Sequence, residues 1–143
     1  MDDLDKKLLT LLGNDARISV ATLARRLSVA RTTVQARIER LERQKIIAGY
    51  TVKLGENIRA GHIRATVLLQ IEPRTNAAVL ARLKPLPQVE IVHTCSGRFD
   101  LILQVVAQTT TELDSTIDNI GEITGVIKSE SLIQLATKID RAL

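Results

Sequence analysis

The stretch from Ser19 to Tyr50 constrains the fold more strongly than any other part of the chain. Its apolar residues recur three or four positions apart, which is the spacing of residues on one face of a helix. The first such face consists of Leu23, Ala24 and Leu27, and the second of Val34, Ile38 and Leu41. Ser28 and Val29 interrupt the pattern between them. We therefore expect two helices joined by a tight turn, the first with Ser19 as its N-cap and the second running from about Ala30 to Gln44.

The second of these helices has one face without large apolar residues. At about 100° per residue, the side chains that point away from the apolar stripe are small, polar or cationic. They are Thr32, Thr33, Ala36, Arg40 and Arg43, with Gln35 and Arg37 on the flanks. Such a face fits the major groove of DNA, where Gln and Arg reach base edges. The pattern predicts a helix-turn-helix; the alternative is an amphipathic helix pair whose charged face is only solvated.

The charge distribution favours the helix-turn-helix. From Arg17 to Lys45 the chain has eight Lys or Arg residues against Glu39 and Glu42, a balance of +6. Residues 1–50 carry ten basic and six acidic side chains, whereas residues 51–143 carry ten of each. The net charge of +4 therefore belongs to the N-terminal third, as expected if this part contacts DNA.

We expect the DNA contacts to come from basic and polar residues of the two helices. The candidate set is Arg25, Arg26, Arg31, Thr32, Thr33, Gln35, Arg37, Arg40 and Arg43. The candidates for reading base edges are Thr32, Gln35 and Arg40. The candidates for phosphate contacts are Arg25, Arg26 and Arg43. Taken singly, each residue is equally well explained as solvated surface, and inward packing of Arg37 beside Ile38 remains open.

The same segment resembles the DNA-binding half of the Lrp/AsnC family, the leucine- and asparagine-responsive feast/famine regulators. The matching residues are Leu4-Asp5, Leu8-Leu9, Asp15-Ala16-Arg17-Ile18-Ser19, Leu23-Ala24, Val34, Arg37-Ile38, Leu41-Glu42, Ile46-Ile47 and Gly49-Tyr50. The chain departs from the family pattern at Ala30, where a capping Ser is usual, and at Lys45, where Gly is usual. Both departures concern the ends of the second helix.

The rest of the composition narrows the partner and the compartment. Tyr50 and Phe99 are the only aromatic residues, so the chain cannot form stacking platforms for single strands, and duplex DNA fits better. Cys95 is the only cysteine, which excludes an intrachain disulfide and fits a reducing compartment. No apolar run approaches the ~18 residues of a membrane span, and the acidic start MDDLDKK is unlike a signal peptide. We expect a cytoplasmic protein with no membrane partner.

The neighbouring segments complete the N-terminal part. A leucine stripe predicts a first helix ending at Gly13-Asn14; its residues are Leu4, Leu8, Leu11 and Leu12. Asp2, Asp3 and Asp5 lie at the start of this helix, where they favour the helix dipole and need no chemical role. We expect a three-helix, winged-helix-like domain over residues 1–50. The extended character of residues 45–61 predicts a linker strand, and we place the linker at residues 51–61.

Residues 62–143 alternate between strand and helix patterns. The expected strands are His62–Glu72, Val89–Cys95, Phe99–Ala107 and Ile127–Ile139, and the expected helices are Asn76–Leu86 and Leu113–Ile120. Ser96-Gly97-Arg98 is short enough for a hairpin turn, and Thr109 with Glu112 has capping-box spacing. The order β-α-β-β-α-β predicts a ferredoxin-like domain, with an antiparallel sheet and both helices on one face, so the fold class is α+β.

The other face of that sheet has no covering layer in the sequence. The segments ATVLLQI and FDLILQVV carry apolar residues at both odd and even positions, so each strand presents apolar side chains on both faces of the sheet. Self-association is the economical way to cover the second face. We therefore expect a homodimer at least.

This half also resembles Lrp/AsnC proteins, through Gly97-Arg98-Phe99-Asp100, Leu101 to Leu103 and Gly125-Val126. The resemblance implies that two domains pair sheet against sheet in a dimer, and that dimers assemble further, into tetramers or octamers, which bind amino acids between subunits. It also implies an effector site, whose candidate residues are Gly97, Arg98, Phe99, Asp100, Leu132, Ile133 and Gln134. On the residues alone, Asp100 is either a solvent-facing strand start or a ligand for an amino group.

No other chemistry is visible in the sequence. His93 and Cys95 lie two positions apart on an expected strand without further ligands nearby, so we expect no metal site there or at His62. No catalytic or cofactor-binding motif appears, so we expect neither catalysis nor a cofactor. We predict a sequence-specific DNA-binding transcription regulator controlled by an amino acid or related small molecule. The alternative is a small-molecule-binding regulatory subunit of a metabolic enzyme that does not bind DNA.

Overall fold

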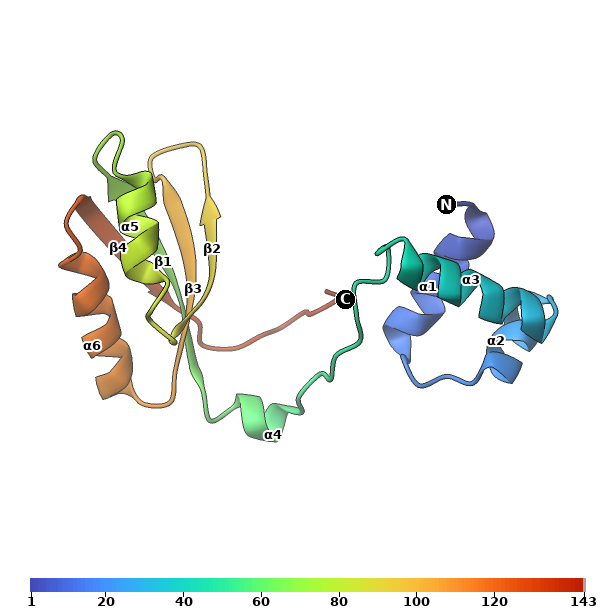
Figure 1. Cartoon of the computed structure of the whole chain (residues 1–143). Helices are drawn as coiled ribbons and strands as arrows, with labels where there is room; N and C mark the ends of the chain where they lie inside the picture. Colours follow the sequence, from blue (N-terminus) through green and yellow to red (C-terminus); the bar gives the residue numbers. More distant parts are fainter. Residues whose placement is uncertain (143) are drawn as a thin grey trace. The chain divides into compact units, whose positions relative to one another are not determined.

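The computed structural model describes residues 1–142. These residues form two compact units, which we treat separately (Figure 1). The first consists of Met1–Lys53 together with residues 140–142, and the second is Leu54–Ile139. We call the first unit the head and the second the sheet domain.

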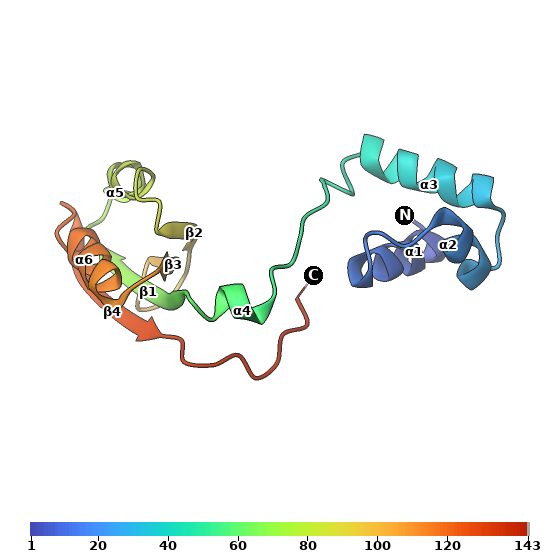
Figure 2. The ribbon, with the colours of Figure 1, turned by 90° about the horizontal axis from the view of Figure 1, so that it is seen from below.

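The head is built from three helices, as the leucine pattern predicts. They are α1 (Asp3–Asn14), α2 (Val20–Leu27) and α3 (Arg31–Arg43), and Figure 2 shows α3 lying along one side of the other two. Their buried apolar residues form one core: Leu8, Leu12, Leu23, Ala24, Val34 and Leu41. Each comes from a stripe of three-and-four spacing, so the packing follows directly from the sequence period.

The helix ends of the head differ in how they are capped. Asp2 caps α1 in a reciprocal capping box with Asp5, and the Ser19 hydroxyl caps α2 by accepting from the Thr22 N–H. Ala30, at the start of α3, has no side-chain oxygen for this purpose. At the other end of α3, Lys45 lies in the left-handed region at φ 58°, a conformation that favours glycine.

The expected linker strand is wrong. Among the described residues of the segment 45–61, the only regular element is a one-turn helix, α4 (Glu56–Arg59). The backbone N–H groups of Ile46 and Ile47 both donate to the Leu41 carbonyl, at 2.9 and 3.0 Å, and so close the end of α3. Residues 51–60 are exposed along their whole length, and within residues 1–142 of a single chain no strand pairs with them.

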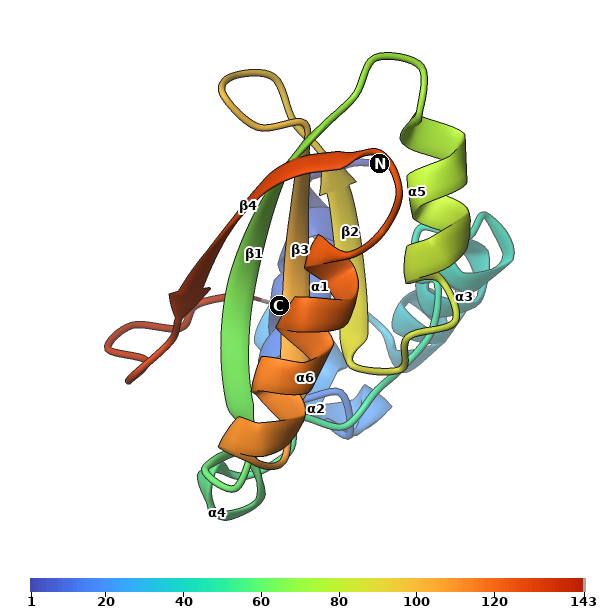
Figure 3. The same ribbon diagram turned by 90° about the vertical axis from the view of Figure 1, so that its left-hand side faces the viewer.

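The sheet domain has the expected ferredoxin-like topology. Its four strands are β1 (Ile63–Ile71), β2 (Val89–Thr94), β3 (Leu101–Ala107) and β4 (Val126–Ile133), joined in the antiparallel order β2-β3-β1-β4. Figure 3 shows α5 (Asn76–Leu83) and α6 (Thr110–Gly121) together on one face of this sheet. The hairpin between β2 and β3 and the Thr109 cap of α6 are also as predicted.

Several boundaries differ from the sequence prediction: β3 begins at Leu101 rather than Phe99, α6 begins at Thr110 rather than Leu113, and two other elements end early. The last strand ends at Ile133 rather than Ile139, because its register with β1 ends at Ala65 opposite Ile133. Helix α5 ends at Leu83, since Pro85 cannot continue a helical hydrogen-bond ladder.

The two faces of the sheet are chemically distinct. The face under the helices holds the core residues Ala65, Val67, Leu69, Leu101, Leu103 and Val105, which pack against Val79, Leu83, Leu113 and Ile120. The opposite face, which we call the outer face, carries alternate residues of the same strands. Its residues include Thr66, Leu68, Ile102, Gln104, Val106 and Leu132. Leu132 is 52% exposed, so this mixed apolar and polar face meets solvent in a single chain.

Candidate DNA interface and ligand loop

Helix α3 presents three different sides. Val34 and Leu41 are buried in the head core, with Ile38 half-buried beside them. A second side carries Arg37 and Arg40, which are only partly exposed. The third side, which we call the outer side of α3, is exposed and consists of Arg31, Thr32, Gln35, Ala36, Glu39, Glu42 and Arg43.

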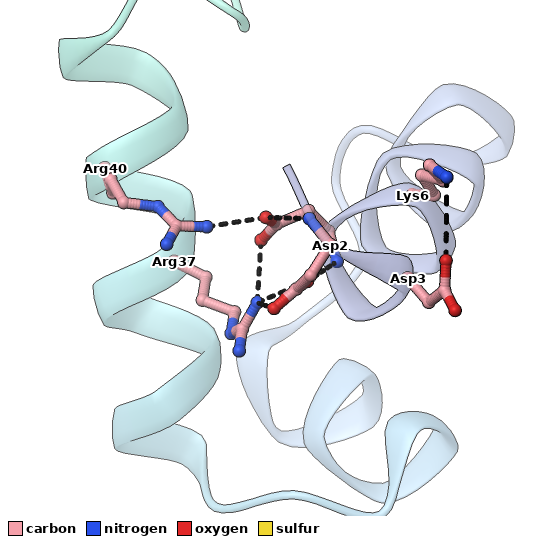
Figure 4. A network of polar contacts seen from close by, with 6 residues as sticks. Asp2, Asp3, Lys6, Arg37 and Arg40 are labelled. Carbon is pink, nitrogen blue, oxygen red and sulfur yellow. Dashed lines mark hydrogen bonds and ion pairs between the residues drawn. The ribbon is translucent and has the colours of Figure 1, made fainter.

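Arg37 and Arg40 bind the two aspartates at the start of α1 (Figure 4). Arg37 Nη1 lies 2.6 Å from both carboxylate oxygens of Asp2 and 3.0 Å from Asp5 Oδ1. Arg40 Nη2 lies 2.6 Å from Asp5 Oδ2. The Asp5 side chain is only 1% exposed, so its charge is held inside the head by these partners. We call this set the acid-arginine network.

The network corrects the expected position of Arg40. The helical period places Arg40 away from the apolar stripe, but its guanidinium turns toward α1 and bonds Asp5 instead of pointing outward. The physical reason is the buried Asp5 carboxylate, which requires cationic partners. Arg37 likewise turns inward, the arrangement that sequence reasoning left open. The signal that was missed is the pair Asp2 and Asp5, three positions apart, facing Arg37 and Arg40 at the same spacing.

The network favours the charged forms of Asp2, Asp5 and Arg37. The hydrogen bonds from Arg37 hold the pKa of Asp2 far below its ordinary value. Burial acts to raise the pKa of Asp5, but hydrogen bonds from the Asp2 N–H and from Arg37 outweigh it, so that pKa is also lowered. The same two carboxylates raise the pKa of Arg37. Among the buried side-chain nitrogen and oxygen atoms of the described residues, Arg40 Nε is the one without a hydrogen-bond partner.

The remaining DNA candidates lie at the surface of the head. Arg25 and Arg26 are exposed in the last turn of α2, and Arg31 and Arg43 are exposed at the two ends of α3. Thr32 and Gln35 are also exposed, whereas Thr33 is half-buried. Gln35 Nε2 donates to Glu39 Oε1 at 3.1 Å, a contact within the outer side of α3.

Tyr50 joins the end of the head to α3. Its hydroxyl donates to Glu42 Oε1 at 2.7 Å, and this bond raises the pKa of Tyr50 to about 12. Through this hydrogen bond, the Glu42 carboxylate contacts the segment that follows α3.

In the sheet domain, the Gly97–Asp100 loop borders a shallow pocket. The pocket has a volume of about 280 Å³ and is lined by Gln70, Arg98, Phe99 and Lys128. The Arg98 guanidinium lies over the Phe99 ring, 5.8 Å from its centroid. Two cationic side chains beside an aromatic ring make this a suitable place for a small anionic group.

Asp100 ties this loop to the end of β1. Its Oδ2 accepts from the Ile71 N–H at 2.8 Å, and its own backbone N–H donates to the Leu69 carbonyl at 2.8 Å. The Cys95 thiol donates to the Phe99 carbonyl across the same turn at 3.0 Å. Asp100 is therefore half-buried and already partnered, rather than a solvent-facing start of β3.

The other effector candidates lie further along the sheet. Lys128 pairs with Gln70 beside the loop, whereas Leu132 pairs with Thr66 and Ile133 with Ala65. Gln134 Nε2 donates to Gln104 Oε1 at 3.4 Å. The four positions from Lys128 to Leu132 correspond to about 13 Å of strand. A single chain therefore does not bring residues 132–134 together with the Gly97–Asp100 loop.

Over residues 1–142, no three His, Cys, Asp or Glu side chains are grouped so that they could hold a metal ion. Within the same residues, no helix is long and apolar enough to cross a membrane.

Comparison with known proteins agrees with this architecture. Residues 1–42 match the AsnC-type helix-turn-helix domain, and residues 64–143 match the Lrp/AsnC ligand binding domain. The structure superposes on Escherichia coli AsnC with a TM-score of 0.89 and 23% identity, covering 100% of this chain and 97% of that one. It superposes on the feast or famine regulatory protein of M. tuberculosis, complexed with L-methionine, with a TM-score of 0.85 and 25% identity, covering 99% and 97%.

Curated relatives point the same way. The HTH-type transcriptional regulator LysM of Saccharolobus solfataricus is 33% identical over 96% of this chain and 95% of its own length. An uncharacterized HTH-type transcriptional regulator of Pyrococcus horikoshii is 33% identical over 96% of this chain and 94% of its own length. These relatives do not favour the alternative of an enzyme subunit that ignores DNA. The chain belongs to the Lrp/AsnC family of DNA-binding transcription regulators.

Proposed function

We propose that this regulator reads operator DNA with the outer side of α3 and responds to an amino acid bound beside the Gly97–Asp100 loop. The observation that carries the proposal is the presence, in one chain, of two parts. One is an exposed helix face flanked by the arginines Arg25, Arg26, Arg31 and Arg43, and the other is a ligand-binding domain whose loop borders a pocket. We infer that the protein works in the cytoplasm, beside the DNA.

The DNA contacts we propose come from the candidates that are exposed. Arg31, Thr32 and Gln35 lie in the first turns of α3, the part of a recognition helix that meets base edges. Arg25, Arg26 and Arg43 flank them and suit phosphate contacts. We assign Arg37 and Arg40 to holding α3 on α1, because their guanidinium groups bind Asp2 and Asp5.

The proposed ligand is an α-amino acid. Arg98 and Lys128 line the pocket and suit the α-carboxylate, which gains most from charged donors. Asp100 suits the α-amino group: one of its oxygens accepts from the Ile71 N–H, and a carboxylate accepts more than one bond. The methionine bound to the M. tuberculosis relative supports an amino acid as the ligand class.

We further propose that two chains pair through the outer face of the sheet. That face carries Leu68, Ile102 and Val106, each only half-buried in one chain, together with the exposed Leu132. Apolar side chains of this kind are stabilised when a second copy removes them from water. A ligand that bound one arrangement of the assembled chains more tightly would shift the equilibrium toward it and so alter the spacing of the heads.

The test combines assembly with DNA binding. The size of the full chain is measured by light scattering with and without each of the twenty amino acids, and the active one is then titrated by calorimetry. Lys128→Gln should weaken binding of that amino acid about tenfold, because one charge-assisted bond is lost. Lys84→Gln, which removes an exposed lysine that does not line the pocket, is the matched control. Equal affinities in both variants would contradict the proposed site.

A further inference from the structure

The outer side of α3 carries a carboxylate at its centre. At about 100° per residue, its seven residues span an arc of roughly 140° from Arg31 to Ala36. Glu39 lies near the middle of that arc, and Glu42 lies near its Arg31 edge. A carboxylate that faces DNA is repelled by phosphates, so its place at the centre of a surface that would face DNA calls for a specific partner.

The other charged groups of α3 do not supply that partner. Arg37 and Arg40 are bound to the aspartates of α1, and Glu42 accepts from the Tyr50 hydroxyl. Within residues 1–142, no ion pair joins Glu39 to Arg31 or Arg43. Glu39 instead accepts from Gln35 Nε2 at 3.1 Å, and both side chains are exposed. The two therefore form a bonded pair that faces outward, one turn apart on the same helix.

The bond between them prepares Gln35 for one kind of contact. A glutamine amide has two N–H groups and one oxygen, and the bond to Glu39 uses a single N–H. The remaining N–H and Oε1 are the two groups with which glutamine reads the N7 and N6 positions of adenine. The bond to Glu39 fixes the orientation of the Gln35 amide, with its nitrogen toward Glu39. The second carboxylate oxygen of Glu39 suits the N4 amino group of cytosine.

We propose that Gln35 and Glu39 act as one base-reading unit that selects exocyclic amino groups in the major groove: adenine opposite Gln35 and cytosine at a nearby base pair opposite Glu39. The inference rests on the proposed use of the outer side of α3 in reading DNA. It adds the class of base that the operator must present and gives an acidic residue a part in specificity.

The experiment is selection of duplexes from a randomised library by the full chain, followed by affinity measurements on the selected sequence. The variants are Gln35→Ala and Glu39→Ala, which keep the helix and leave the head core untouched. Replacing the selected adenine or cytosine should weaken wild-type binding about tenfold. In Gln35→Ala, replacing the selected adenine should no longer weaken binding. In Glu39→Ala, replacing the selected cytosine should no longer do so. Arg43→Ala, the control, should weaken all duplexes alike and keep the preference.

Two results would overturn the assignment of the pair alone. One is an unchanged base preference in Glu39→Ala and Gln35→Ala. The other is a Glu39→Ala protein that binds every duplex more tightly by the same factor, which would make Glu39 only a repelling charge. A wild-type protein that enriches no sequence would overturn the base-reading function itself, and the pair with it.

Discussion

Two arginines three positions apart on α3 should respond very differently to removal. Arg43 is exposed, whereas Arg40 is bound to the buried carboxylate of Asp5. Each phosphate contact contributes about 0.9 to the slope of log affinity against log salt. Arg43→Ala should therefore reduce the magnitude of that slope by about 0.9 for each bound head. Between roughly 50 and 200 mM salt, the loss of affinity should be about threefold smaller for the variant than for the wild type. Arg40→Ala should leave the slope unchanged in the folded protein.

The loss from Arg40→Ala should appear in stability instead. Without Arg40, Asp5 keeps only Arg37 as a cationic partner inside the head, so the melting temperature should drop by several degrees, while Arg43→Ala leaves it unaltered. Circular dichroism of the helices gives the melting temperature, and fluorescence anisotropy of a labelled duplex at several salt concentrations gives the slope. The reasoning fails if Arg40→Ala melts like the wild type and lowers the slope as much as Arg43→Ala, because the network would then open on DNA.

Acid should destabilise the head through its aspartates, because the pKa values of Asp2 and Asp5 are lowered in the folded protein. Their contribution to the free energy of unfolding is present above the ordinary pKa of 3.8 and is lost as the pH falls through the folded-state pKa values. Denaturant unfolding at a series of pH values should show this, with a flatter profile for Asp5→Asn; an identical profile would contradict it. Asp100→Asn keeps an oxygen for the backbone N–H it binds but loses the charge, so calorimetry should show effector affinity reduced about tenfold, with ligand-free DNA binding unchanged. Gly125→Ala should destabilise the sheet domain by about 1–3 kcal/mol, since φ is +104° and the new Cβ would lie 3.0 Å from a threonine side chain. Gly121→Ala, where nothing lies within 4 Å, is the matched control in thermal melts.

The sequence predicts the elements of this protein better than it predicts their side-chain partners. The stripes through Leu8, Leu23 and Val34 give the three helices of the head because helical period and burial coincide. The same period places Arg40 on the open side of α3, yet its partner Asp5 is 35 positions away, and local periodicity carries no information on such a pairing. An Asp-Arg match at equal spacing on two helices was the available signal.

The errors in the extended segments have a related cause. The residues after α3 have strand-forming side chains, but a strand exists only where another strand offers hydrogen bonds. Among the described residues of one chain, this segment has no such neighbour. The last strand was predicted too long for the same reason, since its pairing with β1 stops at Ala65 opposite Ile133. The ligand loop was predicted from resemblance, and Lys128 and Gln70 were missed because they join it only through the register of the sheet.

The left-handed Lys45 at the end of α3 has a consequence for how this head could be redesigned. A lysine in that conformation costs about 1 kcal/mol relative to glycine, so Lys45→Gly would make the head more stable without touching its core. The same change removes a cation from the carboxyl end of α3, where positive charge favours the helix dipole and adds to the attraction for DNA. At this single position, glycine therefore favours the stability of the head, whereas lysine favours its affinity for DNA.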